Sequence, residues 1–420
     1  MSQVGFLPVP VGAKDLLAYS LAAGEEAVSR LRHQAAGLAG ARILHISSTP
    51  YGGGVAEHLG THLPLLRDLG LEAEWQVLSV PDEFLSVTKA MHNGLQGMDV
   101  AWTDRMEQLY LDTLRQLAPT LVDSWDFVVV HDPQPAALLT YLQETGRFDE
   151  ARWVWRCHID LSAVNERVWE FLRPHVERYA ATIWTMAEYV PATLSSQRRV
   201  AVFPPGIDPL AGKNIELDDA FARSLCRVYD VDPDRPVVCQ VSRFDPWKDP
   251  VGVIRGFDPV GEALPEAQLV LIGSMAGDDP EGCRYWDMAR EEQAGRHHVR
   301  LLADVDDFVV NAFQRVARVV VQKSRREGFG LTASEAMWKG RPVVASRVGG
   351  LRLQVRDGRD GFLVDGSEGA GELAPRLIEL LDDPAAADAM GASGRDHVRE
   401  RFLLTRELED YLALLTDLGR

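Results

Sequence analysis

Short apolar runs alternate with amphipathic stretches along most of the chain. The runs are rich in β-branched and aromatic residues, and each ends in polar or turn-forming residues. This pattern predicts buried strands of a parallel sheet whose faces are covered by the intervening helices. The first series of predicted strands is Ala41–Ser47, Glu72–Val80, Phe127–Asp132, Trp153–His158 and Thr182–Met186.

A second series of the same kind follows, so the chain is predicted to fold as two doubly wound, Rossmann-like α/β domains facing each other across a cleft. The segment Val202–Asn214 separates the series, is rich in proline and glycine, and lacks a helical period. We place the domains at residues 1–205 and 206–399, and expect a C-terminal helix at about 400–420 to pack back on the first. The second series is Pro236–Ser242, Ala267–Gly273, Val299–Asp304, Ala317–Ser324 and Pro342–Val348.

Composition and charge exclude several classes of protein. The 420 residues carry a net charge of −18 and contain no block of Lys or Arg, which argues against a nucleic-acid partner. No apolar run approaches about 20 residues and the N-terminus lacks the features of a signal peptide, so we expect no membrane partner and a cytoplasmic location. The sequence leaves a homodimer open. Reduced thiols rather than a disulfide framework or zinc site are expected, because no CxxC spacing occurs among Cys157, Cys226, Cys239 and Cys283.

A run of three glycines, Gly52–Gly54, follows the first predicted strand and opens a helix. Glycine lets the backbone approach a ligand, and a helix N-terminus favours an anion. A dinucleotide fingerprint would need a sixth-position glycine where this chain has Glu57, and an acidic residue at the end of the next strand, which is missing. A glycine turn that serves packing alone is the other interpretation.

Polar groups also end two very apolar strands of the first domain. The segment "HDPQP" provides His131, Asp132 and Gln134, and "WRCHID" provides Arg156 and His158. Ligands of parallel sheets bind beyond the carboxyl ends of the strands, so the two segments favour a pocket for a polar substrate. A satisfied core histidine is the alternative for His158 alone. Zinc binding by these groups has no supporting ligand spacing.

In the second domain, "SRFDPWKDP" places Arg243 and Lys248 after the first strand. Two cations at a strand end suit a diphosphate, since arginine binds as a fork and lysine as a compact charge. A solvated charged loop is the alternative. Without a Walker-type motif, an ATPase has little support.

The stretch "SRREGFGLTASEAM", which starts at Ser324, predicts a strand end, a glycine turn and the start of a helix. Gly328 and Gly330 relax the backbone so that helix amides near Leu331 could face the same anion as the two cations. Glu327 stays on the loop, within reach of a neutral polar group such as a sugar hydroxyl.

Glu335, later in the same stretch, has two interpretations. Thr332 to Glu335 reads Thr-Ala-Ser-Glu and fits the S/T-x-x-E capping box, which stabilises a helix by roughly 0.5–2 kcal/mol through its cap residue. The carboxylate could instead bind a ligand.

Taken together, these motifs resemble the retaining GT-B glycosyltransferases of glycosyltransferase family 4. The resemblance rests on the two cations, the Glu327 and Glu335 pair with seven residues between them, "GRPVVASRVGG" and "DGRDGFLV", in order over Pro236–Val364. The strings "GGGVAEHL", "HDPQP", "WRCHIDLS" and "VTKAMHNGLQG" are similar to those of the trehalose glycosyltransferring synthases. One departure is Gln354, where many relatives carry an acidic residue.

The resemblance implies roles in binding the nucleotide and its phosphates. Arg243 and Lys248 would neutralise the donor diphosphate, Glu335 would bind the ribose hydroxyls, and Asp304–Asp307 would flank the base. Backbone near the phosphates would come from Gly53, Gly54, Gly328, Phe329, Gly330 and Leu331.

The resemblance also implies roles in binding the sugars. Glu327 would bind hydroxyls of the transferred glucose and His158 would lie beside it, so these two join the two cations as the expected catalytic residues. Asp132, Gln134 and Arg156 are the expected ligands of the acceptor glucose.

The implied reaction is retaining, reversible transfer of glucose from ADP- or UDP-glucose to free glucose, which gives trehalose. A front-face mechanism is expected, with no metal or other cofactor. The alternatives are a retaining trehalose phosphorylase, a family 4 enzyme with another acceptor, and a sugar- or nucleotide-binding regulator without turnover.

Overall fold

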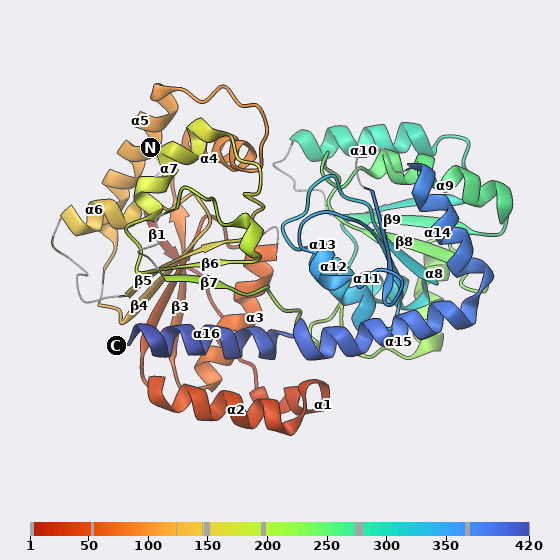
Figure 1. The fold of residues 1–420 in the computed structure, drawn as a ribbon, viewed down its shortest axis with the longest axis horizontal. Coiled ribbons are helices and arrows are strands. Elements are labelled where there is room, and N and C mark those ends of the chain that lie inside the picture. Colours follow the sequence, from red (N-terminus) through yellow and green to blue (C-terminus); the bar gives the residue numbers. More distant parts are fainter. Residues whose placement is uncertain are drawn as a thin grey trace. The chain divides into compact units, whose positions relative to one another are not determined.

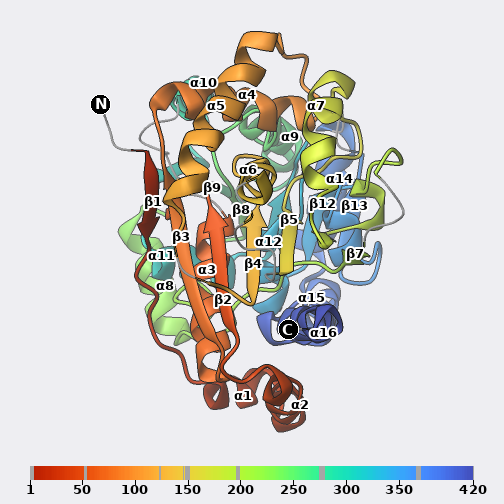
Figure 2. The ribbon, with the colours of Figure 1, turned by 90° about the vertical axis from the view of Figure 1, so that its left-hand side faces the viewer.

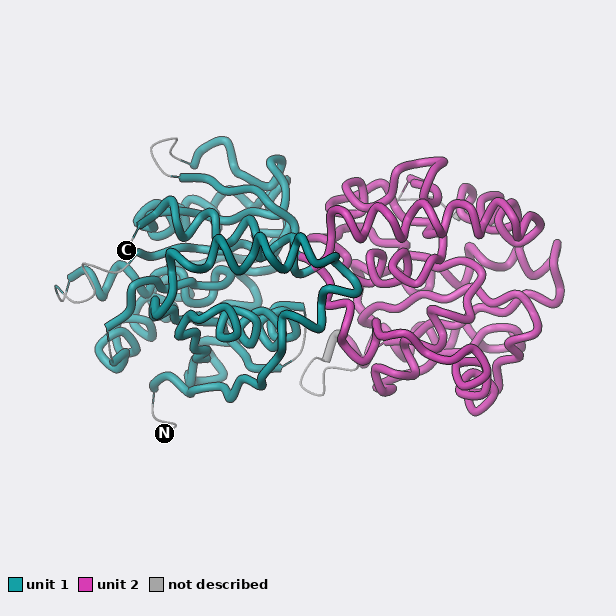
Figure 3. Tube along the Cα trace, turned by 90° about the horizontal axis from the view of Figure 1, so that it is seen from below, with its two compact units in different colours: residues 1–205, 404–420 teal, residues 206–403 magenta. Residues whose placement is uncertain are grey.

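The chain forms two compact units, each built on its own sheet (Figures 1 and 3). Unit 1 comprises residues 1–205 and 404–420, and unit 2 comprises residues 206–403. The architecture confirms the predicted pair of α/β domains with parallel sheets. The computed structural model describes residues 4–51, 54–122, 124–144, 146, 152–194, 199–273, 280–365 and 370–419.

The sheet of unit 1 has the strand order β1-β3-β2-β4-β5-β6-β7 (Figure 2). All neighbours pair in parallel except β1, which runs antiparallel to β3. The short strands β1 and β7 were not predicted, because neither is a buried apolar run. The strands are β1 (Gly5–Pro8), β2 (Arg42–Ser47), β3 (Glu72–Ser79), β4 (Phe127–His131), β5 (Arg152–Cys157), β6 (Ala181–Trp184) and β7 (Arg199–Val202).

Helices cover both faces of this sheet. Figure 1 shows α4 to α7 on one side of the strands and α2, α3 and α16 on the other. Helix α16 is the C-terminal helix of the chain and packs beside α2 within unit 1. The helices are α1 (Ser20–Ala23), α2 (Glu25–Ala35), α3 (Gly54–Asp68), α4 (Asp82–Leu95), α5 (Asp104–Leu117), α6 (Leu138–Glu144), α7 (Glu166–Val176) and α16 (Leu404–Leu418).

Side chains of the central strands alternate between these two helical layers, as the period of two in a strand requires. Leu44 and Ile46 of β2 belong to the apolar core beneath α4 to α7. His45, between them, therefore faces the layer that contains α3 and α16. The same alternation separates the core residue Trp155 from Arg156 on β5.

The sheet of unit 2 is entirely parallel, in the order β10-β9-β8-β11-β12-β13. Valine and leucine side chains of its central strands form a core with α9 and α14. Strand β13 was not predicted as a strand, although its sequence was part of a recognised motif. The strands are β8 (Val237–Val241), β9 (Gln268–Gly273), β10 (Val299–Ala303), β11 (Val319–Gln322), β12 (Val343–Ser346) and β13 (Gly361–Val364).

The remaining helices of unit 2 alternate with these strands or follow them. Helix α12 connects β11 to β12 and begins at the glycine turn that the sequence predicted. The helices are α8 (Asp219–Val228), α9 (Pro250–Ala263), α10 (Pro280–Gln293), α11 (Asp307–Val316), α12 (Leu331–Trp338), α13 (Leu351–Gln354), α14 (Ala370–Asp382) and α15 (Pro384–Arg401). Within the described residues, no helix is long and apolar enough to cross a membrane.

Candidate functional site

A charged cluster lies at the carboxyl ends of β8 and β11 in unit 2. These strands are parallel neighbours, so the loops that follow them emerge at the same edge of the sheet. Lys248 lies in the loop after β8, Glu327 lies in the loop after β11, and Lys248 Nζ forms an ion pair with Glu327 Oε2. The structure thus brings together two residues that are 79 positions apart.

Two further groups hold the Glu327 carboxylate in place. Ser324 Oγ donates to Glu327 Oε2 at 3.2 Å and Gln322 Nε2 donates to the same oxygen at 3.4 Å. Together with the Lys248 ammonium, three donors converge on one oxygen of a buried residue. Such convergence fixes the orientation of the carboxylate before any ligand arrives.

The glycine turn beside Glu327 depends on Gly330. Its φ is +86°, in the left-handed region, and it is the N-cap of α12. A Cβ at this position would lie 3.0 Å from Leu351 Cδ2 and 3.1 Å from Glu327 Cγ. Glycine therefore lets the chain turn sharply into α12 while Glu327 packs against the turn, and it leaves the helix N-terminus beside the carboxylate loop.

The capping-box interpretation of Glu335 is wrong. The helix already begins at Leu331, so Thr332 lies inside it, and its hydroxyl donates to Gln322 Oε1 at 3.0 Å. Glu335 Oε1 forms an ion pair with Lys213 Nζ at 3.0 Å. Glu335 Oε2 is buried and has no hydrogen-bond partner among the described residues. A buried acceptor in this state is suited to a donor that a ligand would bring.

A buried lysine, which the sequence did not single out, supports the same helix. Lys339 Nζ donates to Gln314 Oε1 at 2.8 Å, to Asn214 Oδ1 at 3.0 Å and to the Glu335 carbonyl oxygen at 3.1 Å. Burial lowers the pKa of Lys339 to about 7, although the nearby Glu335 charge acts in the opposite direction.

Arg243 occupies a different environment from Lys248, although both follow β8. Its side chain is 53% exposed and its guanidinium contacts Asp245 Oδ2 at 2.9 Å. Asp304, which follows β10, has a left-handed backbone with φ of +51°, and Asp306 caps α11 by accepting a hydrogen bond from Phe308 N.

In unit 1, five histidines gather on the face of the sheet covered by α3 and α16. This histidine cluster surrounds an ion pair between Arg156 on β5 and Glu407 on α16, whose side chains are only 3% and 1% exposed. Arg156 also stacks over the Phe203 ring, with its Cζ 5.5 Å from the ring centroid. The cluster consists of His45, His58, His62, His131 and His158.

Three of these histidines form a hydrogen-bonded chain with a tyrosine. The Tyr411 hydroxyl is 3.1 Å from His45 Nε2, and His45 Nδ1 is 3.0 Å from His131 Nε2. His131 Nδ1 is in turn 2.9 Å from His158 Nε2. The hydrogen-bonded chain runs from Tyr411, a buried residue of α16, to His158, which is half-buried at the end of β5.

Burial keeps the histidine cluster neutral. Burial, with smaller contributions from the neighbouring His58 and Arg156, lowers the pKa of His45 to about 3. Burial likewise lowers the pKa of His131 and His158 well below 6.5. A second positive charge beside the Arg156 guanidinium is unfavourable in such surroundings.

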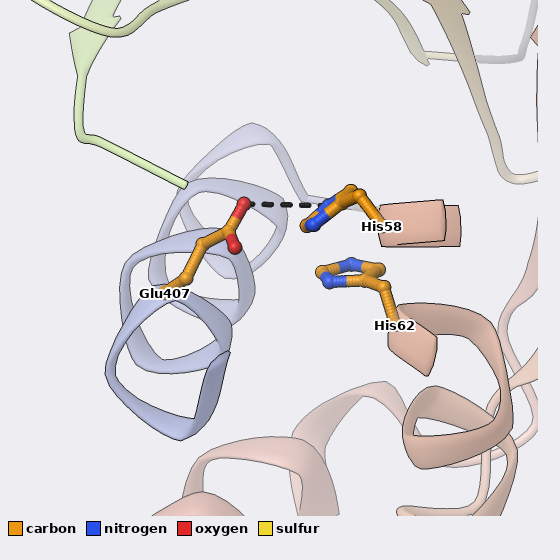
Figure 4. A group of neighbouring side chains, drawn as sticks. All are labelled: His58, His62 and Glu407. Carbon is orange, nitrogen blue, oxygen red and sulfur yellow. Dashed lines mark ion pairs between the residues drawn. The ribbon is translucent and has the colours of Figure 1, made fainter. Parts of the chain in front are cut away.

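Two histidines and Glu407 form a group that resembles a metal site (Figure 4). His58 and His62 are four residues apart on α3, and their ring nitrogens and a Glu407 oxygen all lie within 4.8 Å of one another. The Arg156 guanidinium, however, already neutralises Glu407. A divalent ion would leave excess positive charge in a buried place, so we assign no metal to this group.

The predicted residues of unit 1 occupy distinct positions near the cluster. Asp132 has a left-handed backbone with φ of +63°, and its Oδ1 accepts from His158 N at 2.8 Å. Burial raises the pKa of Asp132 to about 7. Gln134 Oε1 is buried without a partner among the described residues, and Arg156 is held by Glu407. Gly54 is the exposed first residue of α3, whereas Gly53 lies outside the described residues.

Sequence reasoning missed most of the histidine cluster. A weak signal existed, because His58 and His62 on one helix, and Glu407 and Tyr411 on another, have the i, i+4 spacing that puts polar groups on one face. Nothing in the sequence indicated that these two faces meet over His45.

Comparisons with known proteins agree with this architecture. Residues 45–191 match the family model "Trehalose synthase, N-terminal domain", and residues 225–397 match "Glycosyl transferases group 1". The chain is 43% identical over 413 residues to a trehalose synthase of Pyrococcus horikoshii, with 97% of each chain covered. It is 45% identical to a trehalose synthase of Rubrobacter xylanophilus, with 97% of this chain and 98% of the relative covered.

More distant proteins share part of the sequence or only the fold. A trehalose phosphorylase of Pleurotus pulmonarius is 27% identical over 86% of this chain, which spans 54% of that relative. The solved structure of a sucrose-phosphate synthase from Thermosynechococcus elongatus has a TM-score of 0.71 at 20% identity, with 90% of this chain and 98% of that one covered. The two-domain architecture is thus that of GT-B glycosyltransferases, and the near-complete, high-identity matches show that the chain belongs to the trehalose synthase family of group 1 glycosyl transferases.

Proposed function

We propose that this protein is a retaining glucosyltransferase that makes trehalose from a nucleotide-activated glucose and free glucose, reversibly and by a front-face mechanism. The observation that carries the proposal is the Lys248–Glu327 pair beside the N-terminus of α12. A cation and a helix N-terminus suit the phosphates of a nucleotide sugar, and a fixed carboxylate next to them suits the hydroxyls of its glucose.

Stabilisation of the departing nucleotide is the main electrostatic task in this reaction. Lys248 and Arg243 supply positive charge, and the backbone of Gly328–Leu331 supplies amides at the start of α12. These groups are positioned before the reaction, which makes them effective at stabilising developing negative charge. On this proposal no metal ion is needed.

Glu335 favours a nucleotide donor over glucose 1-phosphate. Its buried Oε2 lacks a hydrogen-bond partner among the described residues, while its Oε1 pairs with Lys213. A ribose hydroxyl would supply the missing donor, whereas a phosphorylase substrate has no ribose. The partial overlap with the phosphorylase relative points the same way.

Unit 1 supplies the groups proposed to bind the sugars. His158 would contact the transferred glucose, and Asp132, Gln134 and Arg156 would bind the acceptor. Gln134 Oε1 is a buried acceptor without a partner among the described residues, so it can accept from a sugar hydroxyl. Glu407 holds the Arg156 guanidinium in place and so fixes the direction of its remaining N–H donors.

In the front-face mechanism, the acceptor hydroxyl attacks C1 of the donor on the face from which the nucleotide leaves. The bond from C1 to the phosphate oxygen breaks, the new C1–O bond forms on the same face, and a phosphate oxygen takes the hydroxyl proton. A double displacement would instead need a carboxylate nucleophile. Glu327 is suited to binding, because Lys248, Ser324 and Gln322 converge on its Oε2.

The decisive experiment incubates the purified protein with glucose and each of several nucleotide-glucoses, including ADP- and UDP-glucose. Proton NMR would show α,α-trehalose and the matching nucleoside diphosphate in equal amounts. A parallel reaction with glucose 1-phosphate and glucose tests the phosphorylase alternative. Trehalose from glucose 1-phosphate alone would replace the proposal with a phosphorylase, and binding without any disaccharide would identify a regulator.

A chelator separates the metal-independent proposal from a metal-dependent one. We expect the rate of trehalose formation to be unchanged after dialysis against EDTA. Loss of activity, with recovery on adding a divalent ion, would show that the cations of unit 2 are insufficient by themselves.

A further inference from the structure

The hydrogen-bonded chain from Tyr411 to His158 restricts where protons lie. Each nitrogen–nitrogen contact in it needs one N–H and one lone pair. The contacts use both nitrogens of His45 and both nitrogens of His131, so the tautomer of one ring dictates that of the next. Only two arrangements of the neutral chain satisfy all three contacts.

In the first arrangement, the Tyr411 hydroxyl donates to His45 Nε2. His45 and His131 then carry their protons on Nδ1, each donating to the next ring. His158 accepts at Nε2 and carries its own proton on Nδ1, at the outer end of the chain. The second arrangement reverses every donor, so His158 would present a lone pair at Nδ1 instead.

The buried end of the chain decides between these arrangements. A phenol is a good hydrogen-bond donor and a neutral imidazole nitrogen is a strong acceptor, which favours donation by Tyr411. In the reversed chain, His45 would donate to the phenol oxygen. The Tyr411 hydroxyl proton would then lose the acceptor that the described residues give it, in a fully buried position. His158 imposes no such preference, because it is half-buried.

We propose that Tyr411, His45 and His131 are positioning residues that hold His158 as its Nδ1–H tautomer, so that His158 presents a hydrogen-bond donor to an oxygen atom of the bound sugar nucleotide. A histidine in water favours the proton on Nε2, so the chain imposes the less common form. The catalytic consequence rests on the proposed function, whereas the tautomer itself does not.

The ring protons can be measured directly in the wild-type protein. NMR of the full chain labelled with 13C,15N-histidine distinguishes protonated from unprotonated ring nitrogens, and single His→Gln variants assign the signals. We expect a protonated Nδ1 and an unprotonated Nε2 in all three rings at pH 7.5. An Nε2–H form at His158 would overturn the proposal without any need for a designed variant.

Tyr411→Phe removes the terminal donor with little change in shape. We expect the three rings to shift toward the Nε2–H form and kcat for trehalose synthesis to fall roughly tenfold, with KM for the nucleotide sugar nearly unchanged. Unchanged histidine signals in this variant would overturn the proposal, as would shifted signals with wild-type kcat.

A matched control is Tyr179→Phe. Tyr179 is also buried in unit 1, and its hydroxyl donates to the Ala136 carbonyl oxygen at 2.8 Å, outside the chain. The Tyr179→Phe variant should leave the tautomers as in wild type. The same shifts of the histidine signals in both variants would point to a general structural effect. If the wild-type protein makes no trehalose, the proposed function fails. The NMR result still decides whether the hydrogen bonds from Tyr411 to His158 set the tautomer of His158.

Discussion

The charged cluster of unit 2 and the histidine cluster of unit 1 differ in their charge and in how their residues are brought together. The first is made of ion pairs at strand ends, and its members come from two short segments, Ser242–Asp249 and Gln322–Glu327. The second is made of neutral rings around one buried ion pair, and its members come from three strands and two helices.

This difference indicates which ligand each cluster suits. Partly exposed cations with a helix N-terminus favour an anion, since the ligand replaces water around charges that already exist. Unit 1 offers neutral histidines and Asp132, whose pKa burial raises to about 7. These groups favour uncharged hydroxyl groups, which bring no charge into a buried place. The four predictions below test this division, from the largest expected effect to the smallest.

Replacing Glu327 with glutamine should have the largest effect on catalysis. The change removes the charge that pairs with Lys248 and weakens the proposed contact to glucose hydroxyls, so kcat/KM for the nucleotide sugar should fall roughly 10²- to 10³-fold. Steady-state kinetics of trehalose synthesis measure this loss. Asp388→Asn, in an exposed pair with Arg318 in the same unit, is the control and should stay near wild type. Near-normal kcat/KM in E327Q would contradict the assigned role.

Replacing Glu407 with glutamine should have the largest effect on stability. It leaves the Arg156 charge buried without its partner, which should reduce the free energy of unfolding by about 3 kcal/mol in urea denaturation. Glu409→Gln, on the same helix, breaks a more exposed pair with Arg30 and should cost less than about 1 kcal/mol. Equal losses in both variants would show that the buried pair has no special importance.

Replacing Glu335 with glutamine should weaken nucleotide binding specifically. The pair with Lys213 would lose its charge and the ribose would lose an acceptor, so KM for the nucleotide sugar should rise roughly tenfold. Binding of ribose-free glucose 1-phosphate, measured calorimetrically, serves as the comparison and should change little. If both ligands weaken equally, Glu335 only supports the helix.

The histidine cluster should make unit 1 sensitive to acid. The buried rings have pKa values below that of an unfolded chain, near 6.5, so the unfolded state binds more protons as the pH falls. The contribution of the buried histidines to the free energy of unfolding is therefore fully present above about pH 6.5 and is lost progressively toward pH 3. Each histidine contributes a slope of at most about 1.4 kcal/mol per pH unit.

Replacing His62 with leucine should lower this slope, as measured by urea denaturation between pH 7.5 and 5. The exposed His33 provides the control, because His33→Gln removes a histidine outside the cluster. An unchanged slope in H62L would mean that His62 is not held neutral by burial.

Most of the architecture could be predicted from the sequence. Ten apolar runs overlap ten observed strands, because a buried parallel strand needs a continuous run of β-branched and other apolar residues. The three missed strands lie at the edges of the sheets. Strands β1 and β7 remain partly exposed, so their sequences carry little of the signal that burial imposes. Strand β13 is largely buried, but its apolar run is only four residues long.

The candidate site could be predicted only where its residues lie in loops that follow predicted strands. Lys248 and Glu327 could be assigned to the same edge because each lies in the loop after a strand of one parallel sheet. The role of Glu335 was ambiguous, because the sequence pattern fits a capping box. Only the observed start of the helix at Leu331 excluded the capping box. The partners Lys213 and Glu407 carried no sequence signal, because both reach the site from distant segments.

The sequence by itself determined the two parallel sheets, the loops that carry charge at their carboxyl ends and the glycine turn before α12. All of these depend on burial and backbone conformation within a few consecutive residues. Only the tertiary structure decided that Glu407 and Tyr411 lie over His45 and Arg156, or that four groups form one hydrogen-bonded chain. The physical reason is that such contacts depend on how a helix from the end of the chain packs on a sheet from its beginning, which no short pattern of residues specifies.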